Sequence, residues 1–430
     1  MNQLTIGLLG CGNVGGAFAD LLEQRRDTIA TRTEIELRVG AIAVRSVAKH
    51  RDHVSNPDIL TTDTRAVVAD PNVDVVVELI GGIEPARELI MLALQAGKPV
   101  VTGNKELLAN HGAELYATAA ANGVDLLFEA AVAGGIPLIR PLRESLVGED
   151  VVRVMGIVNG TTNYILSQMA QHGAAYTDAL TDAQQLGYAE ADPTADVEGF
   201  DAGAKAAIIA SIAFGASVVA GDVYHEGISS ITPTDIEMAK RLDYVIKAVA
   251  VIEGDTTGET PEVAVRVHPA MIPATHPLAN VNDSFNAVFV EGAAVGDLMF
   301  YGRGAGGGPT ASAVLGDVID AAVNKVAGTS AKIGELVRAR IRPIDDLTCA
   351  YYLSIEVADR PGVLAQVATV FGDHSVSIRS MEQRGLGDDA ELIFITHVCR
   401  EADVRATLDA LRSLDSVNRI VSTIRVVGGG

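Results

Sequence analysis

The sequence is poor in several residue types, and each shortage argues against a class of protein. Cysteine occurs only as Cys11, Cys349 and Cys399 in 430 residues. This number and spacing suit neither a disulfide framework nor a zinc motif, which favours a reducing compartment and predicts a cytoplasmic location. Lys and Arg total 33 against 55 Asp and Glu, for a net charge of −22. Such a charge repels phosphate backbones and anionic lipid, so neither nucleic acid nor a membrane is expected as a partner.

Long apolar runs are also missing. The longest uncharged run, residues 206–221, falls short of the roughly 20 residues that cross a bilayer, and it contains Ser211 and Ser217. It predicts a buried helix instead, which we expect over residues 201–219. The N-terminus lacks the basic segment and cleavage site of a secretory signal. With 48% hydrophobic residues and 43 glycines, the composition is typical of a packed α/β protein of two or three domains.

Short apolar runs alternate with helical patterns in the first third of the chain. Residues 4–9 are such a run, and a glycine-rich turn and a helical pattern follow them. Further buried strands are expected at residues 36–44, 73–80 and 99–102. A helix is expected over residues 85–96, before Gly97. This alternation predicts a Rossmann-type doubly wound parallel sheet over residues 1–132.

The alternation of apolar runs and helical patterns ends near Gly134. The strand-like and helical segments that follow lie around polar motifs, which predict an α+β substrate and dimerisation domain over residues 133–304. Pro309 suits the first turn of a helix that follows, and we expect residues 305–330 to return to the first domain and complete it. A helical linker is expected near residues 331–340. Residues 350–427 then show the order β-α-β-β-α-β, which predicts a ferredoxin-like domain.

Three glycines stand at the first strand-to-helix junction, in the spacing Gly10-x-Gly12-x-x-Gly15. Glycine there lets the backbone turn sharply and approach a pyrophosphate at the helix N-terminus, where amides and the helix dipole favour negative charge. The alternative is a turn with a purely structural role. The candidate cofactor-binding residues of this loop are Gly10, Gly12, Asn13, Val14 and Gly15.

The second predicted strand ends at Arg45, where an NAD-selective site usually offers an acidic residue to the ribose hydroxyls. Arginine suits a 2′-phosphate instead and favours NADP, although NAD stays possible. An exposed arginine with no ligand is the alternative reading.

Two lysines and a carboxylate are the candidate catalytic residues. Lys105 follows a predicted parallel strand, at the edge where open α/β sheets bind ligands, although it could also be a surface lysine at a helix start. Asp201 and Lys205 are four residues apart on one face of a helix that continues as an apolar run. Burial would lower the pKa of the lysine and the carboxylate would raise it, which leaves an ammonium able to protonate a developing alkoxide. An ordinary surface ion pair is the alternative.

The residues around this pair resemble the signature of homoserine dehydrogenases. The matching run is Ala183-x-x-x-Gly187-Tyr188-Ala189-x-x-Asp192-Pro193-x-x-Asp196-Val197-x-Gly199-x-Asp201-x-x-x-Lys205. The resemblance extends to the N-terminal glycine loop, to residues 102–105, to residues 159–164 and to the glycine cluster 302–308. It therefore covers most of residues 1–330, and no aspartokinase is expected to be fused to the chain.

The resemblance implies NAD(P)-dependent interconversion of L-aspartate 4-semialdehyde and L-homoserine, in threonine and methionine biosynthesis. It implies that Lys205 is the proton donor and that Lys105 faces both nicotinamide and substrate. The implied substrate-binding residues are Glu190, Asp196, Asp201, Lys105, Tyr188 and Thr161. Gly187 and Gly302 are implied to line the cofactor.

A sodium site is also implied by the resemblance, at residues 129–136. Its ligands would be Glu129 and the carbonyls of Val132, Gly134 and Ile136, and oxygen ligands suit a hard cation. We expect such an ion to be structural, and a plain strand-to-loop junction is the alternative.

The C-terminal domain resembles an ACT domain, a regulatory module that binds amino acids. Residues 357–364 carry this resemblance, and Asp359, Gly362 and Val363 lie where such modules hold a ligand between paired subunits. The pathway's end product threonine is the implied effector, and a homodimer or homotetramer is expected. A dimerisation domain without a ligand is the alternative.

Two rival functions remain to be weighed. Aspartate-semialdehyde dehydrogenase chemistry needs a cysteine nucleophile in the substrate domain, where this chain has none. A catalytically silent amino-acid sensor would keep the nucleotide fold and the ACT domain, but the intact set of lysines and carboxylates argues against it.

Overall fold

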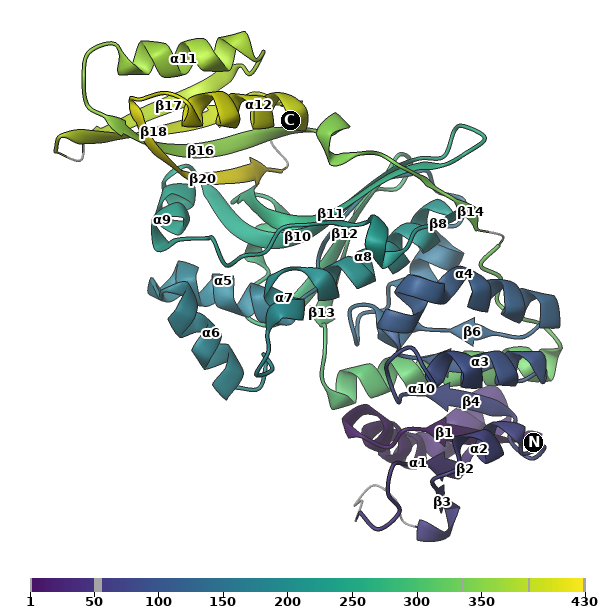
Figure 1. The fold of residues 1–430 in the computed structure, drawn as a ribbon. Coiled ribbons are helices and arrows are strands. Elements are labelled where there is room, and N and C mark those ends of the chain that lie inside the picture. Colours follow the sequence, from purple (N-terminus) through teal and green to yellow (C-terminus); the bar gives the residue numbers. More distant parts are fainter. Residues whose placement is uncertain (1, 50–55, 335, 386, 428–430) are drawn as a thin grey trace.

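Three domains follow one another along an elongated chain (Figure 1). The structure is a computed structural model, and it describes residues 2–49, 56–334, 336–385 and 387–427. The N-terminal domain and the C-terminal domain lie at opposite ends of the molecule, and the middle domain separates them.

The N-terminal domain is a parallel sheet in the order β3-β2-β1-β4-β5-β6, with helices on both faces, which confirms the predicted Rossmann-type fold. Its strands are β1 Asn2–Leu9, β2 Ile35–Ala43, β3 Leu60–Thr61, β4 Val75–Glu78, β5 Val100–Thr102 and β6 Leu126–Leu127. Its helices are α1 Asn13–Thr33, α2 Thr64–Ala69, α3 Ala86–Gln95 and α4 Lys105–Asn122. The pattern did not predict β3 and β6, because two residues are too few for a periodicity.

A helix from much later in the chain packs against this domain. Helix α10 (Gly307–Ala327) lies beside α1, where Val314 and Val318 share one core with Phe18 and Leu22. Helices α1 and α10, which are far apart in sequence, thus bury each other's apolar faces. This packing attaches the segment after the glycine cluster to the N-terminal domain.

The middle domain is built on long antiparallel strands with helices on one face. Its helices are α5 Gly160–His172, α6 Tyr176–Gln185, α7 Thr194–Val197, α8 Phe200–Phe214 and α9 Pro233–Arg241. Its strands are β7 Val151–Ile157, β8 Ala216–Ser217, β9 Tyr224–His225, β10 Tyr244–Asp255, β11 Glu262–Pro273, β12 Phe285–Gly292 and β13 Gly296–Arg303. Helix α8 is buried along most of its length, as its apolar sequence predicted.

Two predicted helices differ from the structure. The helix expected to Val219 ends at Phe214, because Gly215 adopts the left-handed conformation that ends helices (φ 59°). The linker expected to be helical is extended over its described residues and forms two short strands, β14 Val337–Arg338 and β15 Arg340–Ile341. Its apolar side chains Ile333 and Leu336 pack against the main core.

The C-terminal domain has the predicted ferredoxin-like order. Its elements are β16 Thr348–Ala358, α11 Val363–Asp373, β17 Ile378–Gly385, β18 Asp389–Thr396, β19 Cys399–Arg400, α12 Glu401–Arg412 and β20 Val417–Val426. The strands pair in the order β20-β16-β18-β17, and a core including Leu353, Phe371 and Phe394 lies between the sheet and the two helices.

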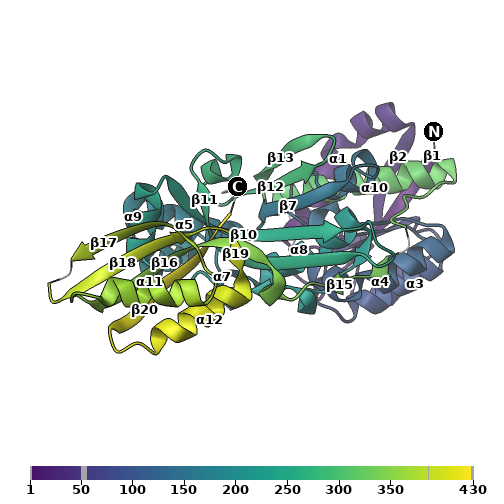
Figure 2. The ribbon, with the colours of Figure 1, turned by 90° about the horizontal axis from the view of Figure 1, so that it is seen from above.

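The sheets of the middle and C-terminal domains are continuous, a feature that the sequence did not predict. Strand β20 pairs in parallel with β11, with Arg425 opposite Ala270 and Val426 opposite Met271. The result is one twelve-stranded sheet that runs from β13 to β17, and Figure 2 shows its strands reaching across both domains.

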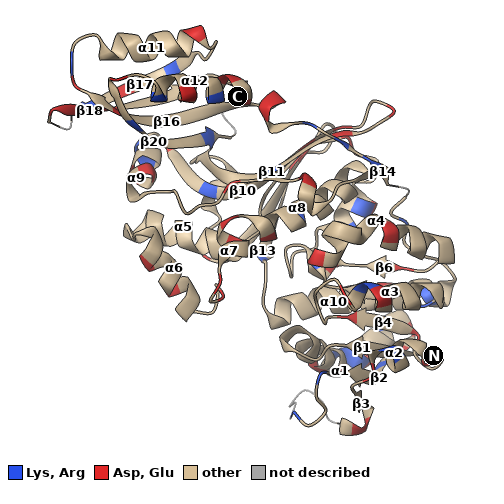
Figure 3. Ribbon diagram, in the orientation of Figure 1, with Lys and Arg blue, Asp and Glu red and all other residues tan. Residues whose placement is uncertain are grey.

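The structure shows where the cysteines and the charged residues lie. No disulfide joins the cysteines of the described chain, although Cys349 and Cys399 face each other across β16 and β19. Basic and acidic residues are interspersed over all three domains (Figure 3). Within the described ranges, no helix has both the length and the apolar character that crossing a bilayer requires.

Candidate active site

A cavity of about 930 Å³ lies where the N-terminal and middle domains meet. The starts of three helices line it, together with the glycine-rich segment between β13 and α10. Its lining residues are Lys105, Glu106, Asn110, Asn159, Gly160, Thr161, Leu186, Gly187, Tyr188, Glu190, Asp192, Ala195, Asp196, Phe200, Asp201, Ala204, Lys205, Ala220, Ser284, Arg303, Gly304, Ala305 and Gly306. None of these is a cysteine, so the cavity offers no thiol nucleophile.

Local sequence fixes where the three helices begin. Asn104 caps α4 by accepting a hydrogen bond from the amide of Leu107 at 3.1 Å, which places Lys105 at the first helical position. Asn159 caps α5 in the same way, from the amide of Thr162 at 2.9 Å. Gly199 precedes α8 in the left-handed region (φ 85°), a conformation that favours glycine.

The structure brings the two candidate lysines to one carboxylate. Lys205 Nζ donates to Asp201 Oδ2 at 2.7 Å and to the carbonyl oxygen of Val158 at 2.6 Å. Lys105 Nζ contacts the other carboxylate oxygen, Oδ1 of Asp201. Lys205 and Asp201 are buried, whereas the Lys105 side chain is 43% exposed. The carboxylate thus holds one ammonium inside the protein and one at the cavity surface.

The charges shift the acidities of this group. Burial alone raises the pKa of the Asp201 carboxyl, but the ammonium groups of Lys205 and Lys105 outweigh burial and hold that pKa far below its usual range. The pKa of Lys205 is lowered, because burial and the nearby Lys105 outweigh the opposing effect of Asp201. Asp201 is therefore a fixed anion, and Lys205 is an ammonium that releases its proton more easily than a surface lysine.

The asparagine that caps α5 also belongs to this cluster, and the sequence reasoning missed it. Asn159 Nδ2 donates to Asp201 Oδ2 at 2.9 Å and to Asp196 Oδ1 at 2.7 Å. It therefore bridges two carboxylates that would otherwise repel each other. The available signal was its place in residues 159–164, which belong to the family resemblance. An asparagine at a helix start, however, is explained by capping alone.

The other candidate substrate residues lie on the same cavity. Thr161 donates through Oγ1 to the carbonyl oxygen of Tyr188 at 2.7 Å, and the Tyr188 ring lies against the Tyr164 ring with centroids 5.0 Å apart. Glu190 is exposed on the rim, and Gly187 forms the preceding turn with φ 76°. The carboxylates of Glu190, Asp196 and Asp201 thus face one space.

The two glycine-rich loops meet at α1 and α10. Gly10 has φ 100°, and a Cβ on Gly15 would lie 2.2 Å from the Gly10 carbonyl oxygen, so the turn admits only glycine at that position. Asn13 and Val14 open α1, whose first turn carries no acidic residue. A Cβ on Gly307 would lie 2.8 Å from Asn13 Oδ1, which shows how closely the loops approach. This geometry fits a pyrophosphate at the α1 N-terminus.

Gly302 and Gly12 are placed differently from the other candidate glycines. Gly302 pairs with Asn286 in β13, one residue before the lining segment that begins at Arg303, and a Cβ on it would lie 3.2 Å from Ile136 Cγ1. A Cβ on Gly12 would meet no atom within 4 Å. Arg45 is exposed just after β2, on the edge of the sheet next to the glycine turn.

The loop of the candidate sodium site packs against the same region. The carboxylate of Glu129 accepts hydrogen bonds from the amides of Leu138, Ile139 and Arg140 at 2.5, 2.7 and 2.9 Å. A Cβ on Gly134 would lie 2.4 Å from the carbonyl oxygen of Gly304. Val132 and Ile136 are buried. Among the described residues, no group of three or more His, Cys, Asp or Glu side chains could hold a metal ion, so a cation here would depend on main-chain oxygens.

The candidate effector residues lie far from the cavity, at one end of the C-terminal domain. Gly362 caps α11 with φ 90°, and Val363 is buried as its first residue. The carboxylate of Asp359 accepts a hydrogen bond from Gln383 Nε2 at 3.3 Å.

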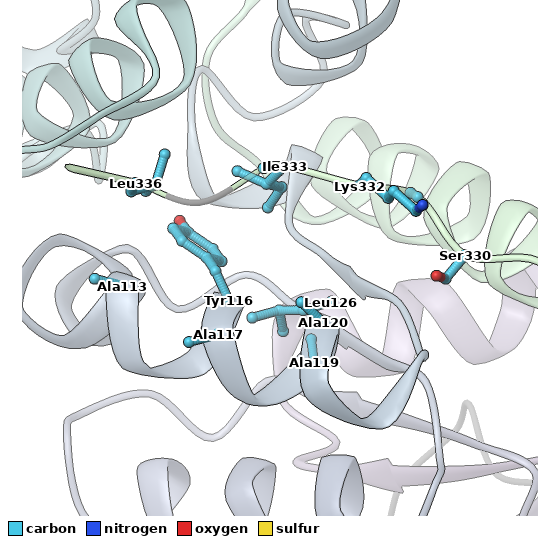
Figure 4. A pocket seen from close by; sticks show the side chains of 12 residues that line it. Ala113, Tyr116, Ala117, Ala119, Ala120, Leu126, Ser330, Lys332, Ile333 and Leu336 are labelled. Atoms are coloured by element: carbon cyan, nitrogen blue, oxygen red, sulfur yellow. The ribbon is translucent and has the colours of Figure 1, made fainter. Parts of the chain in front are cut away.

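A second cavity, of about 610 Å³, lies between α4 and the extended linker (Figure 4). Its wall is largely apolar and includes Tyr116, Leu126 and Ile333, with Lys332 at one end. Its lining brings together no acid and base pair.

Comparisons with known proteins match each of the three domains. Family models match in three places: "Homoserine dehydrogenase, NAD binding domain" over residues 10–129, "Homoserine dehydrogenase" over 137–319 and "ACT domain" over 351–416. The homoserine dehydrogenase of Corynebacterium glutamicum is 52% identical over 425 residues, which cover 98% of this chain and 95% of that protein.

Solved structures give the same result. The crystal structure of a homoserine dehydrogenase from Thiobacillus denitrificans superposes with a TM-score of 0.93 at 43% identity, covering 99% of this chain and 98% of that one. A hyperthermophilic archaeal homoserine dehydrogenase in complex with NADPH has a TM-score of 0.64 at 27% identity, covering 75% of this chain and 98% of that one. The chain therefore belongs to the homoserine dehydrogenase family, as an oxidoreductase that acts on a CH–OH group and carries an NAD-binding domain and a C-terminal ACT domain.

Proposed function

We propose that this enzyme interconverts L-aspartate 4-semialdehyde and L-homoserine with NADP, on the threonine and methionine biosynthetic route, and that the cavity between its first two domains is the active site. The observation that carries the proposal is the pair of lysines on one buried carboxylate at the cavity wall. The nicotinamide cofactor supplies the hydride when it is bound.

Lys205 is the proposed proton donor. In the direction of reduction, the aldehyde carbon gains a hydride and its oxygen gains a proton from Lys205 Nζ, so the carbonyl becomes the hydroxyl of homoserine. The carbonyl of Val158 and the carboxylate of Asp201 hold Nζ from two sides, which leaves one N–H for the substrate. The lowered pKa of Lys205 suits a group that gives up a proton at each turnover.

Acidic residues on the same cavity are proposed to hold the substrate ammonium. Glu190 lies on the rim with Tyr188, and Thr161 fixes the segment through the Tyr188 carbonyl. Asp196 is held by Asn159, and Lys105 reaches the cavity from the opposite domain. With its ammonium group held by these carboxylates, the substrate would be oriented with its aldehyde group toward Lys205.

The proposed preference for NADP rests on Arg45 and on the relative that was solved with NADPH. We expect Arg45→Ala to raise the KM for NADPH about tenfold and to change the KM for NADH less than twofold, because only NADPH carries a 2′-phosphate for the guanidinium. The measurement is aspartate-semialdehyde reduction followed at the nicotinamide absorbance with both reduced cofactors. Arg25→Ala, an exposed arginine of α1, is the matched control. Equal changes with NADPH and NADH would remove Arg45 from the cofactor site.

A structural sodium ion at residues 129–136 also remains a proposal. Because the Glu129 carboxylate already accepts three main-chain hydrogen bonds, it fits an anchor for the loop better than a direct ligand. The carbonyls of Val132, Gly134 and Ile136 would then supply the oxygens, in a loop where Ala133 and Gly134 both have positive φ. The ion would stabilise the loop that supports the glycine-rich segment.

Threonine is the proposed effector of the ACT domain, in a homodimer or homotetramer. The Asp359 carboxylate suits its ammonium group, and the amides at the α11 N-terminus suit its carboxylate. We expect Asp359→Ala to weaken threonine inhibition at least tenfold while kcat without threonine changes less than twofold. Asp373→Ala, at the exposed end of the same helix, is the control. Unchanged inhibition in Asp359→Ala would place the effector elsewhere.

A further inference from the structure

A lysine outside the active site is held in an unusual way. Lys247 lies in the middle of β10 and is 1% exposed. Its ammonium donates to the Val281 carbonyl oxygen at 2.5 Å, to Asn282 Oδ1 at 3.2 Å and to Asn163 Oδ1 at 3.3 Å. All three acceptors are neutral, and no ion pair within the described residues includes this lysine.

A buried ammonium without a carboxylate is unfavourable, since desolvation is offset only by hydrogen bonds to neutral oxygens. Burial accordingly lowers the pKa of Lys247 to about 8, and only the charge of Asp283 opposes this. An apolar side chain of the same length could fill this place on the strand without the free-energy cost of desolvating an ammonium. The ammonium is therefore explained by what it holds together.

It joins two segments that are distant in sequence. Asn163 lies in the first turn of α5, and its Nδ2 donates to the carbonyl oxygens of Val281 and Phe285 at 3.2 and 3.1 Å. Ser167 adds a further link, because its Oγ accepts the amide of Asp283 at 3.1 Å. The ammonium of Lys247 donates both to Asn163 on α5 and to residues 281 and 282, so it connects the two segments.

Both segments form part of the cavity wall. Gly160 and Thr161, in the first turn of α5, and Ser284 line the cavity. A Cβ on Gly160 would lie 2.8 Å from the carbonyl oxygen of Ser284, so the two segments touch. Lys247 lies behind this wall and does not line it.

We infer that Lys247 is a positioning residue for homoserine, which sets from behind the place of the α5 start and of residues 281–285. The inference rests on the proposed binding of homoserine beside Tyr188 and Thr161. The hydrogen bonds of Lys247 do not reach the glycine loops that are assigned to the cofactor. Its loss should therefore affect the substrate and leave the cofactor unaffected.

The test compares Lys247→Met with Lys240→Met, an exposed lysine of the neighbouring helix α9. We expect Lys247→Met to raise the KM for homoserine about tenfold, with kcat within threefold and the KM for NADP within twofold, because a wall that shifts misplaces the substrate first. Asn282→Ala removes one acceptor of the Lys247 ammonium, on the side of residues 281–285. It should raise the same KM about threefold with little change in Tm.

The outcomes separate this inference from the proposed function. A purely structural lysine would lower Tm in Lys247→Met without a selective change in the KM for homoserine, and that result would overturn the inference. If Lys247→Met does not fold, an unchanged KM in Asn282→Ala overturns it instead. A wild-type enzyme that fails to oxidise homoserine would refute the proposed function and this inference with it, whereas an active wild-type enzyme with an unchanged KM for homoserine in Lys247→Met would overturn the inference alone.

Discussion

Two clusters of charged side chains lie at opposite borders of the middle domain. Both combine basic residues with carboxylates, but they differ in what they do. The active-site cluster of Lys105, Asp201 and Lys205 opens onto a cavity of about 930 Å³. The junction cluster lies where β20 meets the middle domain, with Arg425 between Glu226 and Glu401. These three junction residues line neither of the two cavities described above.

The junction cluster encloses Arg425, with Glu401 buried beside it and the Glu226 side chain 34% exposed. Arg425 is 4% exposed, and its guanidinium donates to Glu226 Oε2 at 2.7 Å and to both oxygens of Glu401 at 2.6 and 3.1 Å. The rings of Tyr224 and Tyr351 lie 5.5 and 5.8 Å from it. Burial alone lowers the pKa of Arg425, but the hydrogen bonds and charges of the two carboxylates, together with Tyr351, raise it well above its usual value.

The two clusters use different basic residues, and the chemistry of each residue suits the role of its cluster. At the proposed active site the cation is lysine, whose pKa falls on burial, so its proton can be transferred. At the junction the cation is arginine, whose charge is permanent and whose planar group binds two carboxylates at once. Mutations should therefore affect turnover at the first cluster and stability at the second.

The largest effect on turnover is expected for Lys205→Ala, with kcat reduced by roughly 10² or more and the KM for the cofactor nearly unchanged, because the proton donor is lost. Steady-state kinetics of aspartate-semialdehyde reduction measure it, with Lys240→Ala as the surface control. Normal turnover in Lys205→Ala would remove this lysine from the mechanism and would leave the two clusters without a functional difference.

A smaller effect, on the pH profile, is expected for Asp201→Asn. The carboxylate raises the pKa of Lys205, so its neutralisation should lower that pKa further. Lys205 donates only when protonated, and the alkaline limb of kcat for aldehyde reduction should therefore move to lower pH by about one unit, with kcat reduced roughly tenfold. Asp178→Asn, on exposed α6, is the control. A limb that stays in place would show that another group titrates.

The smallest effect on turnover is expected at the junction. Arg425→Met leaves Glu401 buried and Glu226 half-buried without their partner and should lower the free energy of unfolding by about 3 kcal/mol, with kcat within threefold. Arg419→Met, which breaks an exposed pair on the same strand, should change stability by less than about 0.5 kcal/mol. Denaturant unfolding and kinetics on the same samples check both values. A large loss of kcat with unchanged stability in Arg425→Met would contradict the distinction between the clusters.

Elements with a strong local pattern were predictable from the sequence. The glycine turn after β1, the apolar helix α8 and the order of elements in the C-terminal domain all follow from periodicity and turn residues. The end of α8 was missed because Gly215 lies within an uncharged run. The extended linker was missed because its apolar residues pack on other domains, which no local pattern records.

The active-site cluster was predictable only in part. Asp201 and Lys205 are one helical turn apart, so their proximity follows from sequence. Lys105 is 96 residues away from Asp201. Its place after a predicted parallel strand made it a candidate, but only the family resemblance assigned both residues to one site. The bridging role of Asn159 and the link formed by Lys247 depend on contacts between distant elements. Such contacts are set by the tertiary fold.

The pairing of β20 with β11 has a consequence for how domains of this kind can be exchanged. Main-chain hydrogen bonds do not depend on which side chains the strand carries, so a foreign ACT domain could dock by the same backbone contacts if its last strand had the same length and direction. A graft that begins at the start of β16 but omits the final strand would leave β11 with an unsatisfied edge, open to pairing with other molecules. The last strand of the chain, rather than the covalent tether before β16, is thus the part that a designer of hybrid enzymes must keep.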